Sequence, residues 1–532
     1  MPKVALIQIA AYDLAHAEDG LQRALEMIDD AASRGVDLIV LPECTYPAYF
    51  LRGQREYIQG GLRPWSELVS FFGGKAAEYN CHIVAGLVQP GERNRYLLNA
   101  AVLFGPDGKV IGSTPKSLLW HFDRYWFTRG MQYPVFHTDF GRLGMMVCAD
   151  GRMPEITRIL ALQGAQLIVD STAWVTGGSD RAALTNPQVE YMVQTRALEN
   201  GVWIVAANKI GLEADSVLYC GRSCVIDPDG NRVLVGSTDR EEVIFADVDL
   251  SPAPVAPTGR RPETYATIVQ PTESLLVTRV LHEKVAPETT AVRIAAFQMA
   301  ERPAAVVHLR RIEELLDTAS RQDVKLVVLP GTMPPGTDAD ATKASATLTR
   351  LAELSGQYGC GLAATLAEYE GDRRYRTCFL WDSGRLVGKY RKVHQDEAGY
   401  AQGDELPVFD TSFGRLGIVL DEEGLIPEVA RCLMLKGADT ILWPARASRW
   451  LLQTVARSRA DENKVHVVLA TPVGGGAALV SPSGAVLAAA LPDVEQIVAA
   501  QVLWALSRYK EMAPGTHVVN SRIPEAYKAL AT

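Results

Sequence analysis

The chain has 532 residues, of which 48% are hydrophobic and 22% charged, and its formal net charge at pH 7 is −9. This length exceeds one ordinary hydrophobic core, so we expect two domains of about 250 residues. The acidic balance, without a run of basic residues, argues against nucleic acid and anionic membrane surfaces as partners. The first residues enter a strand pattern without a signal peptide, and no stretch reaches the roughly 20 apolar residues of a membrane-spanning helix. A cytoplasmic location is therefore predicted.

The cysteines argue against a disulfide framework or a metal site. Eight cysteines are few for this length, and their spacing lacks the pairs typical of zinc ligands. Cys220 and Cys224 are four residues apart with no histidine nearby, so we interpret them as packing residues. We expect reduced thiols, no metal and no cofactor.

Hydrophobic periodicity predicts strands alternating with helices through the first half of the chain. The predicted strands are 4–9, 36–41, 82–87, 99–104, 110–114, 143–147, 166–170 and 202–208, and the predicted helices are 17–32, 64–79, 154–164 and 187–200. Turn sequences at 106–108 and 227–230 predict two hairpins. This pattern favours a mixed sheet covered by helices on one face, in the α/β class.

The same order of motifs occurs twice. VALIQIA at 4–10 returns as IAAFQMA at 294–300, and PVFHTDFGRLG at 134–144 returns as PVFDTSFGRLG at 407–417. The offset between matching residues shrinks along the chain, so the second copy has shorter loops. These features indicate one duplicated domain. The predicted parts are a catalytic domain at 1–275, a linker at 276–290, a degenerate domain at 291–510 and a C-terminal tail at 511–532.

Cys148 is the candidate nucleophile. It ends the apolar strand 143–147 and precedes a turn that opens the helix beginning at Pro154. Backbone N–H groups at such a turn can hold an oxyanion, which suits a nucleophile. Taken alone, however, the stretch favours a buried core cysteine, because free cysteine is among the most buried residue types.

Three motifs in the expected order resemble the nitrilase superfamily of carbon–nitrogen hydrolases, in particular its amidase-like branches. They are Leu41-Pro42-Glu43, Pro115-Lys116 and the stretch Cys148–Glu155. The resemblance covers nearly all of the first copy and, in degenerate form, the second. It implies two tandem α-β-β-α sandwich domains packed as a pseudo-dimer. It also implies that Glu43, Lys116 and Cys148 are catalytic, with a plain surface ion pair as the alternative for Glu43 and Lys116.

Elementary chemistry gives each of these residue types a task. A thiol is only slightly ionised at neutral pH, so a base such as Glu43 must remove its proton as it attacks a carbonyl or nitrile carbon. A carboxylate beside the thiol raises the thiol pKa, and the ammonium of Lys116 offsets this charge. Lys116 and the backbone N–H of Ala149 then stabilise the oxyanion, and Glu43 protonates the departing amine.

A further acid is expected beside the lysine. Many amidases of the family carry a second glutamate shortly after this lysine, but no glutamate lies between Lys116 and Cys148. Asp123 is the nearest acid and is our candidate for the accessory role. The alternative is an ordinary salt bridge from Asp123 to Arg124 or Arg129.

An aromatic cluster around Asp123 predicts the substrate pocket. The candidate lining residues are Tyr49, Trp120, His121, Tyr125 and Trp174. As pocket residues they suggest a small-molecule substrate with an apolar or aromatic part. The alternative is packing in the core or at a dimer interface.

The second copy has lost two of the three catalytic residues. Aligning the copies puts Asp421 against Cys148 and Gly331 against Glu43, and only Lys392 keeps the role of Lys116. We therefore predict an inactive second domain that supports the first by burying its apolar helices, and an ion pair between Lys392 and Asp421.

The leading functional hypothesis is hydrolysis of a linear carboxamide through a cysteine thioester, with release of ammonia or an amine. A nitrilase, an N-carbamoyl hydrolase and an amine acyltransferase use the same three residues and remain alternatives. A non-catalytic scaffold or binding protein is the alternative of another class. Further homo-oligomerisation stays open.

Overall fold

The computed structural model describes residues 1–52, 62–92, 95–176, 184–251, 259–283, 285–286, 290–394, 397–446 and 451–532. The chain forms two compact units. The first comprises Met1–Thr258 with Ala513–His517, and the second comprises Gly259–Met512 with Val518–Thr532.

The first unit contains two mixed sheets. The larger has the order β11-β10-β1-β2-β3-β4-β5, and β14 also pairs with β1. Its strands are β1 (Lys3–Ala10), β2 (Leu38–Val40), β3 (His82–Pro90), β4 (Leu97–Phe104), β5 (Val110–Pro115), β10 (Lys209–Glu213), β11 (Val217–Cys220) and β14 (Glu242–Asp247). The smaller has the order β13-β12-β9-β8-β7-β6. Its strands are β6 (Val135–Thr138), β7 (Gly141–Val147), β8 (Leu167–Ser171), β9 (Trp203–Ala207), β12 (Cys224–Ile226) and β13 (Arg232–Val235).

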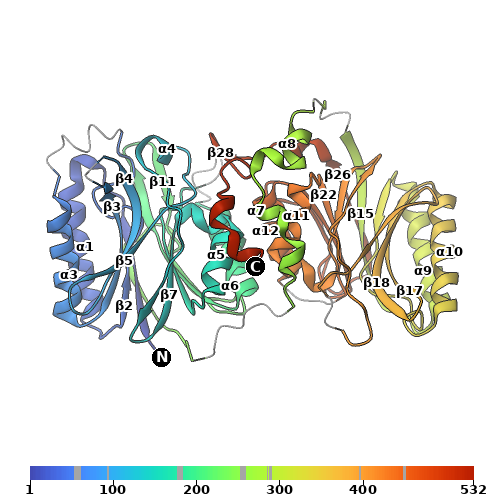
Figure 1. Ribbon diagram of the computed structural model, residues 1–532, viewed down its shortest axis with the longest axis horizontal. Helices are drawn as coiled ribbons and strands as arrows, with labels where there is room; N and C mark the ends of the chain where they lie inside the picture. The colour runs from blue at the N-terminus through green and yellow to red at the C-terminus, as the bar shows by residue number, and fades with distance from the viewer. Residues whose placement is uncertain are drawn as a thin grey trace. The chain divides into compact units, whose positions relative to one another are not determined.

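Helices cover one face of each sheet in this unit. Helices α1 (Ala17–Ala32) and α3 (Trp65–Tyr79) lie on the larger sheet, and α5 (Pro154–Leu162) and α6 (Val193–Asn200) lie on the smaller one (Figure 1). Helix α1 buries Leu21, Ala24 and Ile28 at helical spacing against the sheet. Each fully buried aliphatic side chain of this size contributes about 1.5–3 kcal/mol. The predicted strands and helices are confirmed with ends shifted by a few residues, and the single predicted sheet is in fact two, as the α-β-β-α sandwich requires.

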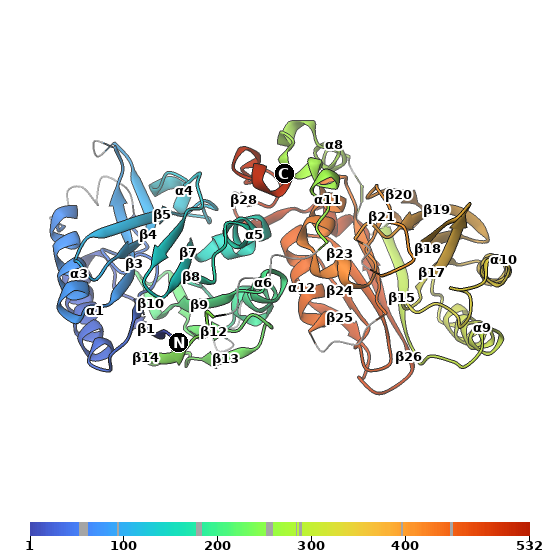
Figure 2. The same cartoon turned by 60° about the horizontal axis from the view of Figure 1, so that its bottom comes forward.

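The second unit repeats these elements with its strands joined into one sheet. β15 (Ala291–Met299) pairs with β23 (His466–Pro472), which connects the two halves of a sheet ordered β19-β18-β17-β16-β15-β23-β22-β21-β20. The other strands are β16 (Leu326–Val328), β17 (Gly361–Glu370), β18 (Arg373–Asp382), β19 (Arg385–Arg391), β20 (Val408–Thr411), β21 (Gly414–Ile418), β22 (Thr440–Pro444), β24 (Ala478–Val480), β25 (Val486–Ala489) and β26 (Gln496–Leu503). Helices α9 (Ala305–Arg321) and α10 (Ala341–Tyr358) cover one part, and α11 (Pro427–Leu435) and α12 (Leu452–Asn463) cover the other (Figure 2).

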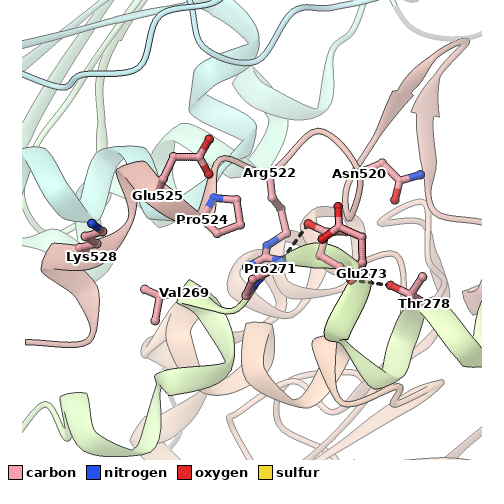
Figure 3. Close-up of a pocket in the computed structure, with 10 residues that line it drawn as sticks. Val269, Pro271, Glu273, Thr278, Asn520, Arg522, Pro524, Glu525 and Lys528 are labelled. Atoms are coloured by element: carbon pink, nitrogen blue, oxygen red, sulfur yellow. Dashed lines mark hydrogen bonds between the residues drawn. The ribbon is translucent and has the colours of Figure 1, made fainter.

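The connector between the repeats folds with the second unit. Its helices α7 (Ala266–Val269) and α8 (Leu276–Leu281) pack on α11, which is why 259–275 belongs here although the sequence analysis assigned it to the first domain. Arg522 from the C-terminal segment donates hydrogen bonds to Ile268 O and, at 3.5 Å, to Thr272 Oγ1. A hollow of about 700 Å³ lies between these two segments, with Arg522 and Pro271 in its lining (Figure 3). Parts of the predicted linker, at 284 and 287–289, lie outside the described residues.

The predicted C-terminal tail is not a free appendage. Its residues 513–517 belong to the first unit, and β28 (Thr516–His517) pairs with β27 (Glu511–Ala513). Among the described residues, no helix has both the length and the apolar character needed to cross a membrane.

Candidate active site

The carboxyl ends of β2 and β8 bring the first catalytic candidate to the junction of the two sheets. Glu43 lies just beyond β2, and its N–H donates to Thr172 O at 3.1 Å, just beyond β8. Ser171 Oγ donates to Leu41 O at 2.6 Å, which ties the same two strand ends together. Gly86 in β3 permits this approach, because a Cβ there would lie 2.2 Å from Pro42 O. The Glu43 side chain is fully buried.

Lys116 joins two buried carboxylates. It follows β5 directly, and its Nζ lies 2.6 Å from Glu43 Oε1 and 2.7 Å from Asp123 Oδ2. Asn99 Nδ2 donates to the same Glu43 oxygen at 2.5 Å. Because these side chains are buried, their charges interact in a low dielectric, and each ionised group depends on the others.

Cys148 occupies a tight turn at the end of β7. It begins a 3-10 helix, Cys148–Arg152, and has a φ of 48°, which is uncommon outside glycine. Its N–H donates to Asp170 Oδ1 at 2.7 Å. The residue is buried, with 8% of its surface exposed.

Asp150 fastens this turn to the segment that carries Lys116. Its carboxylate accepts the N–H of Val147 at 3.2 Å and the N–H groups of Ser117 and Leu118 at 3.0 and 2.7 Å. Burial raises the Asp150 pKa to about 6 despite these bonds. Asp150 therefore fixes the segment that follows Lys116 against the turn that carries Cys148.

The electrostatics of the group follow from burial and mutual charge. Burial and the Glu43 carboxylate raise the Cys148 thiol pKa well above its usual value, and Lys116 opposes them. For Lys116 itself, burial favours the neutral amine, but the charges of Asp123 and Glu43 outweigh it and raise the pKa. The resting site therefore combines a neutral thiol with a charged ammonium. The structure thus places Lys116 in contact with Glu43, and the charges of both act on the Cys148 thiol.

Asp123 pairs with Lys116 rather than with either arginine named as an alternative. It begins α4 (Asp123–Trp126), and its Oδ2 also accepts the Trp120 N–H at 2.9 Å. Burial raises the Asp123 pKa, and Lys116 opposes this shift. Arg124 instead donates to the Tyr125 hydroxyl at 3.0 Å.

The predicted pocket residues separate into two groups. Tyr49 is buried with its ring centroid 5.7 Å from Lys116 Nζ, and Trp174 is fully buried just beyond β8. Trp120 lies 4.6 Å from the Arg152 guanidinium, measured to the ring centroid. Tyr125 differs from them because it is 63% exposed. Tyr49 is therefore the predicted pocket residue whose ring lies beside Lys116.

Several residues of this site were not found by the sequence analysis. Gln188, with its amide oriented to satisfy both partners, donates to Cys148 O at 2.7 Å and accepts from Trp174 Nε1 at 2.9 Å. Asp170 and Asn99 contact Cys148 and Glu43 as described above. Asp150 lies within the cysteine motif and could have been noticed, whereas nothing local marks Gln188 or Asp170.

The loop after β5 is held by a segment from the far end of the chain. Thr516 Oγ1 accepts the His121 N–H at 2.9 Å and donates to Leu119 O at 3.2 Å. Thr516 is fully buried, and His121 has a φ of 44°. Residues 513–517 therefore complete the first unit beside the loop that leads to Asp123. No motif or pattern in the sequence predicted this role of Thr516.

The corresponding place in the second unit holds the predicted ion pair. Lys392 Nζ lies 3.7 Å from Asp421 Oδ2, which confirms the hypothesis, and 3.0 Å from Glu422 Oε2. Arg376 is the closer partner of Asp421. Within the described ranges, no cluster of three histidine, cysteine or acidic residues is arranged to hold a metal, and the eight cysteines are buried and unpaired.

Comparison with known proteins places these observations in a family. The model of the carbon-nitrogen hydrolase family matches residues 3–254 and 293–508. A probable nitrilase of Schizosaccharomyces pombe is 33% identical over 179 residues, covering 34% of this chain and 63% of that protein, which is less than two thirds of its length. An omega-amidase of Xenopus laevis is 30% identical over 243 residues, covering 44% of this chain and 83% of that protein. The solved amidase from Nesterenkonia sp. AN1 is 24% identical, with a TM-score of 0.44, covering 50% of this chain and 99% of that one.

Proposed function

Because the chain belongs to the carbon-nitrogen hydrolase family, we propose that its first unit cleaves the C–N bond of a linear carboxamide through a thioester on Cys148. The observation that carries this proposal is the buried Lys116 ammonium, within 2.7 Å of both Glu43 and Asp123 and electrostatically coupled to the thiol. The omega-amidases among the relatives support an amide over a nitrile.

The chemistry proceeds in two displacements. Glu43 takes the thiol proton as sulfur attacks the carbonyl carbon, and the oxyanion is stabilised by Lys116 and the Ala149 N–H. The C–N bond breaks as Glu43 returns the proton to the departing ammonia or amine. Water then attacks the thioester with Glu43 as base, and the proton from Glu43 regenerates the Cys148 thiol as the carboxylic acid leaves.

The electrostatics around the thiol support a neutral reacting group. Burial and the carboxyl groups of Glu43 and Asp170 raise the Cys148 pKa, and Lys116 opposes them. A substrate carboxylate brought to the reacting carbon would add to this negative charge, whereas an uncharged carboxamide would not. Tyr49, whose ring centroid lies 5.7 Å from Lys116 Nζ, is the aromatic side chain that we assign to the substrate pocket.

The test compares wild type with Cys148→Ala against a panel of amides, nitriles and carbamoyl compounds, with ammonia release as the measurement. We expect release from an aliphatic or aromatic carboxamide by wild type and none above background by the variant. Equal release by both proteins would contradict the thioester mechanism. A folded wild type that releases no ammonia and does not react with electrophiles at Cys148 would instead favour a non-catalytic scaffold.

The same chemistry assigns no hydrolysis to the second unit. Asp421 stands at the position of the nucleophile and Gly331 at the position of the base. A carboxylate cannot replace the thiol in forming a thioester, and glycine has no group to accept a proton. We propose that this unit is inactive as a hydrolase.

A further inference from the structure

The second unit retains a pocket at its inactive site. A cavity of about 350 Å³ is lined by side chains that include Arg376, Arg446, His308 and Glu397. Pockets of this size bind small metabolites. Equivalent backbone hydrogen bonds in the two units show which residues of the first unit correspond to the residues that line this cavity.

Arg376 takes the place of Asn99. The Lys392 N–H donates to Arg376 O at 2.8 Å, as the Lys116 N–H donates to Asn99 O at 2.7 Å. Asn99 holds the catalytic carboxylate of the first unit. In the second unit an amide side chain has therefore become a guanidinium.

Arg446 is a second introduced cation. The Gly331 N–H donates to Ala445 O at 2.9 Å, as the Glu43 N–H donates to Thr172 O at 3.1 Å. Arg446 follows Ala445 directly, so it stands where the first unit has Ala173, next to the pocket residue Trp174. The copy that lost its base and nucleophile has thus gained positive charge at two positions facing one cavity.

The floor of the pocket has unused hydrogen-bonding capacity. Arg376 is 2% exposed, and its Nε and Nη2 bind Asp421 and Gly331 O, whereas Nη1 makes no hydrogen bond to any described residue. His308 is 4% exposed, and its Nδ1 is a buried atom without a partner among the residues that the structure describes. A buried polar atom without a partner is costly, and a ligand that bonds to His308 Nδ1 would satisfy it.

Arg446 can be released to a ligand at low cost. Its guanidinium contacts Glu397 and, at 3.5 Å, Glu422. The Arg446 and Glu397 side chains are 32% and 40% exposed, so solvent weakens their ion pair. A ligand carboxylate that binds both arginines deeper in the cavity can therefore replace Glu397.

We propose that the second unit binds a small carboxylate in this pocket, between Arg376 and Arg446, with His308 contacting the ligand body. Arginine forks match carboxylates in geometry as well as charge, which favours this class over an uncharged ligand. No bond is made or broken, because nucleophile and base are both missing. The proposal does not depend on the reaction of the first unit.

The test is calorimetric titration of the full chain carrying Cys148→Ala, so that the first unit consumes nothing. The probes are propionate, succinate and benzoate, each compared with the uncharged alcohol of the same carbon skeleton, because the first unit is itself proposed to bind carboxamides. We expect one site that binds at least one of these carboxylates, and binds it at least about tenfold more tightly than its alcohol. Absence of binding by all three carboxylates at millimolar concentration, or equal affinity for acid and alcohol, would overturn the proposal.

A substitution locates the site. Arg446→Gln should weaken carboxylate binding at least about tenfold, whereas Arg321→Gln on the exposed end of α9 should not change it. Unfolding midpoints of both variants, measured with urea, report whether the fold is intact. Wild-type affinity in a folded Arg446→Gln variant would place the binding site elsewhere and refute the assignment. If that variant fails to fold, Arg446→Lys provides the same test, because it keeps the charge but loses the fork.

Discussion

The Asp123→Asn variant tests whether the second carboxylate positions the ammonium of Lys116. Asparagine has the same shape without the charge, so the ion pair of 2.7 Å becomes a hydrogen bond from the ammonium to a neutral oxygen. A hydrogen bond to a charged group contributes about 1.5–3 kcal/mol, and loss of the carboxylate charge weakens this contact by about 1–2 kcal/mol without abolishing it. The difference of about 1–2 kcal/mol corresponds to about a 5- to 30-fold lower kcat. KM should change little, because Lys116 acts mainly on the oxyanion formed during the reaction.

Two variants serve as controls in the same amidase assay. Asp107→Asn makes the same chemical change in an exposed pair, where Lys109 Nζ lies 2.8 Å from Asp107 Oδ2, and it should leave kcat unchanged. Asp123→Glu keeps the charge and should retain more activity than Asp123→Asn. Equal kcat values for Asp123→Asn and Asp107→Asn would refute the positioning role of Asp123.

Other contacts can be tested by single substitutions. Burial and a neighbouring carboxylate raise the pKa of Cys148, so the rate of its alkylation by iodoacetamide should keep rising from about pH 6 to about pH 9. An alkylation rate that stops rising near neutral pH would contradict this. Thr516→Val removes the hydroxyl that holds the loop after β5, so kcat/KM should fall about three- to tenfold. The control Thr349→Val, at an exposed position of α10, should leave kcat/KM unchanged. Equal kcat/KM values for the two variants would contradict the role of Thr516 in holding the loop. Asp421→Ala removes the carboxylate that pairs with the buried Arg376 guanidinium, and it should lower the free energy of unfolding, measured with urea, by about 3–5 kcal/mol. A loss no larger than that of Asp410→Ala, which breaks an exposed ion pair with Arg415, would contradict this.

The triad could be predicted from sequence because each member ends a strand that has its own local signal. Glu43, Lys116 and Cys148 follow short apolar runs whose boundaries are marked by proline, by a hairpin turn and by Asp150-Gly151. Glu43 and Lys116 follow strands of the larger sheet and Cys148 follows a strand of the smaller one, and the contacts between the two sheets bring these ends together without any pairwise signal in the sequence. The duplicated motifs reinforced the same boundaries.

The supporting residues could not be predicted because their partners are distant and their segments lack periodicity. Asp170 contacts the Cys148 N–H from the next strand of the sheet, and Gln188 reaches the same residue from the start of a helix. Thr516 contacts a loop almost 400 residues earlier, at a sequence separation of 395. Composition and spacing hold no information on such contacts, which form only when the first unit has folded.

The turn that carries Cys148 is a property of the fold rather than of the catalytic residue. Asp421 occupies the same turn in the second unit with a φ of 52°, close to the 48° of Cys148. Glu423 accepts the N–H groups of Val393 and Leu420 there, as Asp150 does in the first unit. A left-handed backbone at a non-glycine residue costs about 1–2 kcal/mol, and this cost persists in a copy that has no nucleophile. The scaffold therefore maintains the strained turn whether it carries the thiol of Cys148 or the carboxylate of Asp421, which is paired with Arg376.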